Sequence, residues 1–381
     1  MNPQQERENC KDPALMKTAA CLPRFAEFDK KTDQLTVMTY NVENLFDTEH
    51  DEGKDDFSYL PKDYPGKKEA CKRITVPHWR KQCFEADWTN KRYQLKLEQI
   101  RRVLSYTGTL PDIMAFNEIE NEAVLASIAD RLLIDVTTLI TDSPDKRGID
   151  VGLIYNPKKL IFESQKEHIL EDEYFEKKPT RNILEANFVF KEQKLTVLVN
   201  HWPSQGNPAK ARIAAAKKVQ EIVLQKYKEG RAVVILGDFN TVDSDAPHPF
   251  KNVLYETKVE GKSIIFDSFK VKQNQREMTY QAKKKLPKGT NFYPRNMTWS
   301  FLDRIFVTSN LVAQTGLVLD KLSHKVHAPS FIRRDFVYNE GFHAGTIIGG
   351  IPFRSNHKAD TSDKAGYSDH FPVSIVLKYL K

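Results

Sequence analysis

The chain has 381 residues, of which 40% are hydrophobic and 29% charged. This composition is that of an ordinary globular protein and excludes disordered, collagen-like and coiled-coil chains. No segment approaches the roughly 18 consecutive apolar residues of a membrane-spanning helix, so we expect no integral membrane protein. Lys and Arg outnumber Asp and Glu by 58 to 51, a net charge of +7. That charge favours polyanionic partners such as nucleic acid, although a lysine-rich surface alone would also explain it.

All four cysteines lie in the first 83 residues. No Cys-x-x-Cys pair is present, which argues against a zinc ribbon and favours two local disulfides, Cys10 with Cys21 and Cys71 with Cys83. Disulfides imply an oxidising compartment, so we expect a secreted or periplasmic protein. The first 25 residues contain no apolar core of a secretory signal, which leaves free thiols and a cytoplasmic location as the alternative.

Residues 1–33 are polar without periodicity and predict an irregular leader, followed by one domain over 34–381 because no linker composition interrupts it. A long insertion is expected from about 48 to 90, and residues 308–366 are expected to be mostly loop. Apolar periodicity predicts the regular elements. In chain order these are strand 35–40, helix 91–106, strand 113–116, helix 123–132, strands 149–155, 183–190 and 195–200, helix 208–229, and strands 232–236, 304–307 and 372–377.

Polar residues suited to chemistry stand where these strands begin or end. In a mixed sheet, the ends of some strands and the starts of others share one rim, so such residues can converge in a cleft. Hard oxygen donors favour Mg²⁺ or Mn²⁺ over zinc, and a phosphoester is the natural substrate of such a centre. Each residue alone could be a turn or core residue, but one site explains all of them. Asn41, Glu118, His201, Asp238 and Asn240 follow strands, whereas Asp150, Asp303, Asp369 and His370 precede or begin them.

Seven motifs stand in order along the chain. They are TYNVENLFD at 39–47, FNEIEN at 116–121, RGIDV at 147–151, NHWPS at 200–204, GDFN at 237–240, LDRI at 302–305 and GYSDHFP at 366–372. In this order they resemble the endonuclease/exonuclease/phosphatase superfamily of metal-dependent phosphoesterases, in a bacterial, nuclease-like form. The resemblance implies a single α/β domain, a four-layer α/β/β/α sandwich of two packed, mixed, mostly antiparallel sheets.

The resemblance also implies roles for individual residues. Glu118, with Asn41 and Asp369, would hold the metal, and Asp238 with Asn240 would position the attacking water. His370, paired with Asp303, would polarise the phosphate or act as base, and His201, oriented by Asp150, would contact the phosphate or the leaving oxygen. A carboxylate on one ring nitrogen favours the imidazolium form of each histidine. Substrate-binding candidates are Arg147, Arg212 and Asn200, with surface salt bridges as the alternative for the two arginines. Arg304 departs from many relatives and is either a further phosphate contact or a surface residue.

The predicted function is a Mg²⁺- or Mn²⁺-dependent phosphodiesterase, a nuclease acting on DNA or RNA as a monomer. One alternative is a phosphoinositide phosphatase or sphingomyelinase-type enzyme, which requires exposed membrane-contacting aromatics; candidates are Phe57, Tyr59, Tyr64 and Trp79. A second alternative is a non-catalytic binding module on the same fold. It is disfavoured because every expected acid and histidine is present.

Overall fold

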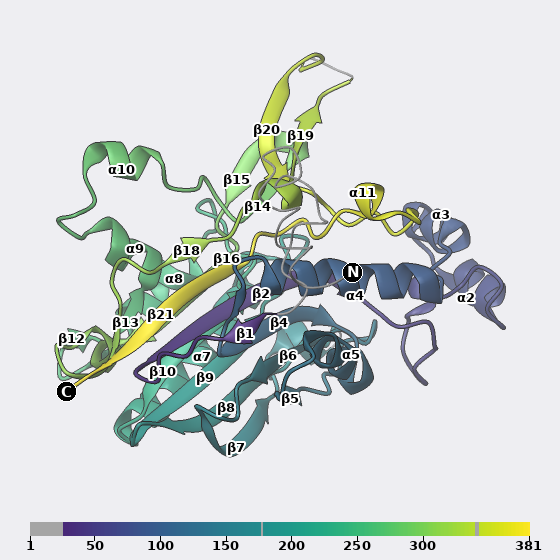
Figure 1. Cartoon of the computed structure of the whole chain (residues 1–381). Coiled ribbons are helices and arrows are strands. Elements are labelled where there is room, and N and C mark those ends of the chain that lie inside the picture. The colour runs from purple at the N-terminus through teal and green to yellow at the C-terminus, as the bar shows by residue number, and fades with distance from the viewer. Residues whose placement is uncertain (1–25, 177, 340–342) are drawn as a thin grey trace.

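The computed structural model describes residues 26–176, 178–339 and 343–381. Two large mixed sheets form its centre (Figure 1). In the first sheet, only β2 and β4 run parallel, and the other pairs are antiparallel. Its strand order is β17 (Gly316–Leu319), β21 (Val373–Leu380), β2 (Gln34–Leu45), β4 (Ile113–Ile119), β6 (Asp150–Tyr155) and β5 (Thr137–Ile140), with β18 (Lys325–Val326) also on β21.

The second sheet repeats this plan, with one parallel pair, β9 and β10, among antiparallel neighbours. Its strand order is β13 (Ile265–Asp267), β16 (Asp303–Thr308), β10 (Ala232–Asp238), β9 (Gln193–His201), β8 (Ile183–Phe190) and β7 (Ile161–His168). Sequence analysis did not predict β7, because its residues are mostly exposed and mostly polar or charged, as an edge strand permits.

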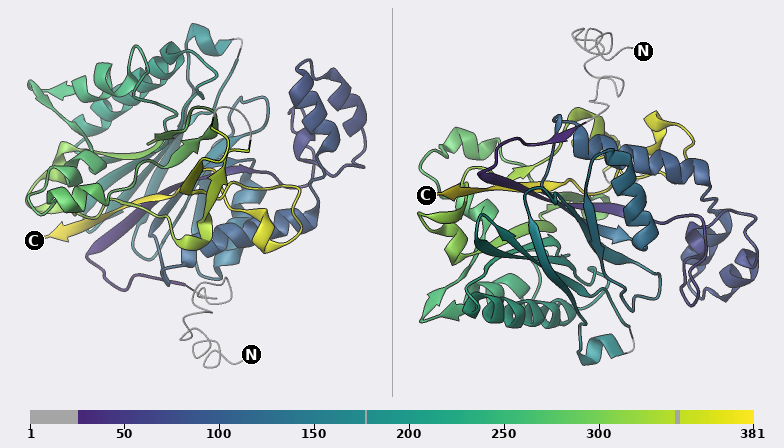
Figure 2. Two further views of the ribbon diagram at one scale, coloured as in Figure 1. Left: turned by 90° about the horizontal axis from the view of Figure 1, so that it is seen from above. Right: turned by 60° about the horizontal axis from the view of Figure 1, so that its bottom comes forward.

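Three apolar clusters separate four layers. The central cluster joins the facing sides of the sheets, for example Val37 and Ile375 against Val197 and Val234. A second cluster packs α4 (Asn90–Ser105) and α5 (Glu122–Leu132) on the first sheet, and a third packs α7 (Ala209–Lys228) on the second. The helices cover opposite outer faces in both views of Figure 2. The predicted four-layer α/β/β/α sandwich is therefore confirmed.

Each parallel pair is connected through one of these covering helices, α4 between β2 and β4 and α7 between β9 and β10. A parallel connection requires such a crossover, because the chain must return to the edge where the first strand began. The four strands β2, β4, β9 and β10 consequently end on one rim. The antiparallel strands β6, β16 and β21 begin on that rim.

The early insertion contains helices that sequence analysis did not predict, η2 (Phe57–Tyr59), α2 (Lys67–Arg73) and α3 (Pro77–Glu85). The predicted disulfide between Cys71 and Cys83 joins α2 to α3. Both sulfur-bearing side chains are buried, and the two helices project beyond the sandwich (Figure 2). Cys10 and Cys21 lie outside the described residues.

The expectation that residues 308–366 are mostly loop is wrong in part. They hold β17 and β18 of the first sheet and a hairpin of β19 (Arg333–Val337) with β20 (Ile347–Pro352), which projects at the top of Figure 1. These strands are short or solvent-exposed, so their sequences lack an apolar alternation. Within the predicted irregular leader, β1 (Glu27–Phe28) pairs with β3 (Thr109–Leu110).

The remaining elements are short connections. In the described part of the chain, no helix has the length and apolarity that crossing a bilayer requires. The connections are α6 (Glu173–Glu176), α8 (Pro249–Asn252), η3 (Leu254–Glu256), β11 (Lys258–Val259), β12 (Lys262–Ser263), α9 (Ser268–Gln273), α10 (Tyr280–Lys284), β14 (Asn291–Tyr293), η4 (Pro294–Asn296), β15 (Thr298–Ser300), η5 (Ser309–Val312), η6 (Ser330–Ile332) and α11 (Ser362–Ala365).

Candidate active site

Strand register brings the predicted residues to one rim. Asp238 at the end of β10 stands opposite His201 on β9 and opposite Asp303 on β16. Gly237 permits this close approach, because a Cβ there would lie 1.9 Å from the backbone oxygen of Asn200. Polar side chains therefore surround the junction of the two sheets. They stand at the ends of β2, β4, β9 and β10 and at the starts of β6, β16 and β21.

Glu118 reaches the junction through a bulge at the end of β4. Its φ is +67°, a left-handed conformation that non-glycine residues rarely adopt, and the β4 register shifts between Asn117 and Ile119. The carboxylate is then held at both oxygens. Oε1 accepts from Nδ2 of Asn41 at 3.1 Å and Oε2 from the backbone N–H of Asn44 at 2.8 Å. Such strain is maintained where the surrounding contacts fix it, as at functional sites.

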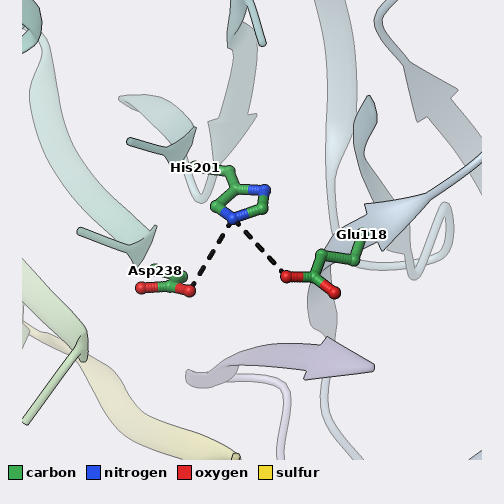
Figure 3. Close-up of side chains that lie close together, drawn as sticks. All are labelled: Glu118, His201 and Asp238. Atoms are coloured by element: carbon green, nitrogen blue, oxygen red, sulfur yellow. Dashed lines mark ion pairs between the residues drawn. The ribbon is translucent and has the colours of Figure 1, made fainter. Parts of the chain in front are cut away.

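Glu118, His201 and Asp238 form a group that could hold a metal ion, with ligand atoms within 4.8 Å of one another. Nε2 of His201 lies 3.7 Å from Oε1 of Glu118 and 3.8 Å from Oδ2 of Asp238 (Figure 3). Two carboxylates and one imidazole are a donor set that suits a divalent cation. The same oxygens both accept from Nδ2 of Asn41, at 3.1 Å from Glu118 and 3.0 Å from Asp238.

The electrostatics of this group favour a cation. Burial raises the pKa of Asp238 to about 7; the charge of His370 opposes this rise, and the charge of Asp303 adds to it. A carboxylate buried among other carboxylates is stabilised when positive charge is placed beside it. Asp238 is fixed in position by the backbone N–H of Asn240, which donates to its Oδ1 at 2.8 Å.

His370 and Asp303 form a buried pair, with Nδ1 of the histidine 2.7 Å from Oδ2 of the aspartate. Burial alone would lower the histidine pKa, but the negative charges of Asp303 and Asp238 raise it well above its ordinary value. These charges favour the imidazolium form of His370, whose Nε2 lies 3.9 Å from Asp238 and 3.7 Å from Asp369. A protonated imidazole at this place can donate to an anionic oxygen.

Comparison with known proteins identifies the family. The family profile described as "Endonuclease/Exonuclease/phosphatase family" matches residues 36–379. This chain belongs to that family. No curated protein matches the sequence.

Solved structures of this family share the fold of the chain. A D. rerio TDP2 humanised by 14 mutations has a TM-score of 0.51 at 17% identity, over 91% of this chain and 99% of that one. An endonuclease/exonuclease/phosphatase family protein from Bacteroides thetaiotaomicron gives 0.51 at 17%, over 91% and 98%. The human Nocturnin catalytic domain, solved with a bound sulfate anion, gives 0.50 at 12%, over 91% and 94%. The chain thus has the fold of a hydrolytic phosphoesterase and a group able to hold a metal.

The pKa of His201 is shifted in the opposite direction from that of His370, contrary to the expectation that both histidines favour the imidazolium form. Burial, together with the positive charges of Arg181 and Arg147, lowers the His201 pKa well below its ordinary value. The expected orienting role of Asp150 is also wrong. Oδ1 of Asp150 accepts from Thr141 Oγ1 at 2.6 Å and from the Ser143 backbone at 2.8 Å, and Nδ1 of His201 has no hydrogen-bond partner among the described residues.

Two residues that were predicted to bind substrate, Arg212 and Asn200, instead have structural roles. Arg212 is 1% exposed, and its guanidinium binds Asp245 at 2.6 Å and the backbone oxygens of Pro203 and Ser204. Asn200 is buried, with Nδ2 bound to the Leu198 oxygen and Oδ1 accepting from Trp202 Nε1. Both side chains have their hydrogen bonds inside the protein, so neither reaches a substrate. Arg304, the departure from relatives, pairs with buried Asp267 at 2.6 Å.

The other predicted residues lie at or beside the rim. Asn41 presents its nitrogen to Glu118 and Asp238, while its Oδ1 accepts from the backbone of Glu43 at 2.9 Å. It therefore orients the two carboxylates. Asn240 has a left-handed φ of +46° and donates to the Trp202 backbone oxygen at 3.1 Å.

Two further predicted residues remain accessible at the rim. Asp369 is part-exposed, with Oδ1 beside Nε2 of His370. Arg147 is 46% exposed, with Nε 3.4 Å from Asp145. Both can therefore reach a ligand that binds at this edge of the sheets.

Sequence analysis missed Glu43 and Arg354. Glu43 is buried, and its carboxylate accepts from Arg354 Nε and from the backbone N–H groups of Ser355 (2.7 Å) and Asp369 (3.0 Å). Burial and the charge of Asp369 raise its pKa to about 7. The Glu43 carboxylate thus connects β2 to the loop that precedes His370. Glu43 stands in the motif at 39–47, but its partners lie more than 300 residues away, so no local signal reveals its role.

Proposed function

We propose that this chain is a divalent-metal-dependent phosphodiesterase that hydrolyses nucleic acid, DNA or RNA. The observation that carries the proposal is the meeting of Glu118 and Asp238 with the His370–Asp303 pair at one rim. Carboxylates able to hold a cation beside a fixed imidazolium match the needs of a phosphodiester, whose anionic oxygens gain charge during hydrolysis.

The residues divide the chemistry between them. Glu118, fixed by Asn41 and the Asn44 backbone, would hold Mg²⁺ or Mn²⁺ with Asp238 and His201 within reach. When bound, the ion would act as a Lewis acid that neutralises charge on the phosphate.

The side chains around the metal ion would transfer protons and stabilise charge. Asp238 would orient the attacking water and accept its proton, because its carboxylate lies between the two histidines. His370, held protonated by Asp303, would donate from Nε2 to a phosphate oxygen.

The net charge of +7 supports a polyanionic substrate over a single lipid headgroup. The membrane-active alternative required exposed aromatic loops, and of its four candidates only Trp79 is exposed. Tyr59 instead stacks on buried Phe46, with ring centroids 4.0 Å apart. The observations therefore favour the nuclease.

The test is incubation of the purified protein with supercoiled plasmid, single-stranded RNA and phosphoinositides, with Mg²⁺ or with a chelator. We expect cleavage of DNA or RNA that requires the cation. His370→Ala should lower turnover by about 10² to 10⁴ while folding is retained. His78→Ala, a histidine exposed on α3, is the matched control. Turnover of phosphoinositide alone, or none with any substrate, would overturn the proposal.

Export and a monomeric state remain predictions. The Cys71–Cys83 disulfide supports an oxidising compartment. Mass-spectrometric mapping of native protein should find this bridge, and free thiols at both positions would remove the support. Light scattering measures the oligomeric state.

A further inference from the structure

A pocket of about 250 Å³ lies between α6, the residues after β9 and the start of α7. It lies beside the catalytic rim, because Arg181 of its lining binds the backbone oxygen of Trp202, the residue that follows His201, at 2.7 Å.

The lining carries surplus positive charge. Arg147, Lys178 and Arg181 face a single acid, Asp145. This carboxylate is shared, since Oδ1 lies 3.4 Å from Nε of Arg147 and Oδ2 lies 3.3 Å from a terminal nitrogen of Arg181. One carboxylate cannot neutralise two guanidinium groups and an ammonium, so the pocket attracts an anion.

Arg181 gives this pocket a fixed cation. Its side chain is 7% exposed, and it is held by Asp145 and by the Trp202 backbone oxygen at 2.7 Å. Its Nε is buried and has no hydrogen-bond partner among the described residues. A buried guanidinium is costly unless its charge is matched, and an anionic ligand in the pocket would supply further negative charge beside it.

The rest of the lining suits a ligand with a polar and an apolar part. Ser204, Thr180 and Asn207 offer neutral polar groups, and Asn207 Oδ1 accepts from Lys178 Nζ at 2.9 Å. Tyr174 and Phe175 add aromatic surface at the α6 side. Phosphate groups attached to a ring-bearing body match this combination.

We propose that this pocket binds a second phosphate of the substrate, next to the phosphate that is cleaved at Glu118, Asp238 and His370. The inference rests on the proposed function for the identity of the first phosphate. The second phosphate belongs either to the neighbouring link of a nucleic acid strand or to a small phosphorylated molecule. The pocket thus selects substrates with at least two phosphates.

Binding without metal isolates the pocket from catalysis. In EDTA, we compare thymidine dinucleotide TpT, with one phosphate, and trinucleotide TpTpT, with two, by titration calorimetry. Inositol 1-phosphate and inositol 1,4-bisphosphate form the second arm. We expect the second phosphate to strengthen binding about tenfold in the wild-type protein. A tenfold gain in the nucleotide arm alone identifies a strand, and a gain in the inositol arm alone identifies a small ligand.

The variants Lys178→Ala and Arg147→Ala should each remove most of that gain, whereas Lys228→Ala, at the far end of α7, should preserve it. Equal affinities for one and two phosphates in the wild-type protein, or a gain that survives both pocket variants, would overturn the inference. The two proposals fail separately. Metal-dependent cleavage without the gain rejects only the pocket, and the gain without cleavage rejects only the catalytic proposal.

Discussion

Asp303 and His370 are buried side by side, 2.7 Å apart, although 66 residues separate them in the chain. The aspartate begins β16 and the histidine precedes β21, strands of different sheets. Their pairing therefore spans the sandwich. It also keeps the imidazole charged with Nε2 toward Asp238.

Asp303→Asn should lower kcat by about 100-fold or more, because the neutral amide no longer stabilises the imidazolium form of His370. The alkaline limb of the kcat–pH profile should also move to lower pH, an effect that a merely structural role would not produce. Asp320→Asn, which disturbs a surface pair with Lys378, is the control. An unchanged pH profile in Asp303→Asn would contradict the assigned role.

Glu118→Gln should weaken Mn²⁺ binding at least about tenfold, since the amide removes a negative charge from the ligand group. Titration calorimetry measures the affinity, and thermal unfolding checks that the variant folds. Glu122→Gln changes an exposed glutamate in the first turn of α5 and should bind as the wild-type protein does. Equal Mn²⁺ affinity in both variants would place the metal elsewhere.

Arg212→Ala should lower the free energy of unfolding by about 3 kcal/mol or more, because it leaves the buried carboxylate of Asp245 without its cation. Denaturant unfolding measures the change. Arg276→Ala, at an exposed position, should shift stability by less than about 0.5 kcal/mol. If Arg212→Ala unfolds normally but raises the KM for substrate, the original assignment of Arg212 to substrate binding is restored.

Stability should fall between about pH 6.5 and pH 3 through His327. Burial, with smaller contributions from Lys325 and His324, lowers the pKa of His327 to about 3. In the unfolded chain His327 therefore binds a proton near pH 6.5, whereas in the folded chain it stays neutral at that pH. Proton binding by the unfolded state favours unfolding as the pH falls. At pH 5 the expected loss is roughly 2 kcal/mol relative to neutral pH.

Urea unfolding at pH 7.5 and pH 5.0 measures this effect. His327→Gln, which can keep bonds to Tyr106 and Ser374, should reduce the difference between the two pH values. A difference as large in the variant as in the wild-type protein would assign the effect to other groups, His324 first among them, because burial lowers its pKa to about 4.

Local sequence determined the framework of this protein. The amphipathic spacing of residues 91–106 and 208–229 predicted α4 and α7 to within about a residue at each end, since a helix depends on neighbours three and four positions away. The motif residues Glu118 and Asp238 were recognised as ends of buried strands. The Cys71–Cys83 bridge likewise follows from close spacing.

Tertiary structure alone decided which partners these residues have. Arg147 and Arg212 were equivalent in the sequence, yet one is exposed at the pocket and the other is locked onto Asp245. Asp150 was assigned to His201 but binds Thr141, and Glu43 gained its role from a distant loop. Such contacts are set by the register between strands that lie far apart in the chain. Apolar periodicity in the sequence depends only on residues within a few positions of one another.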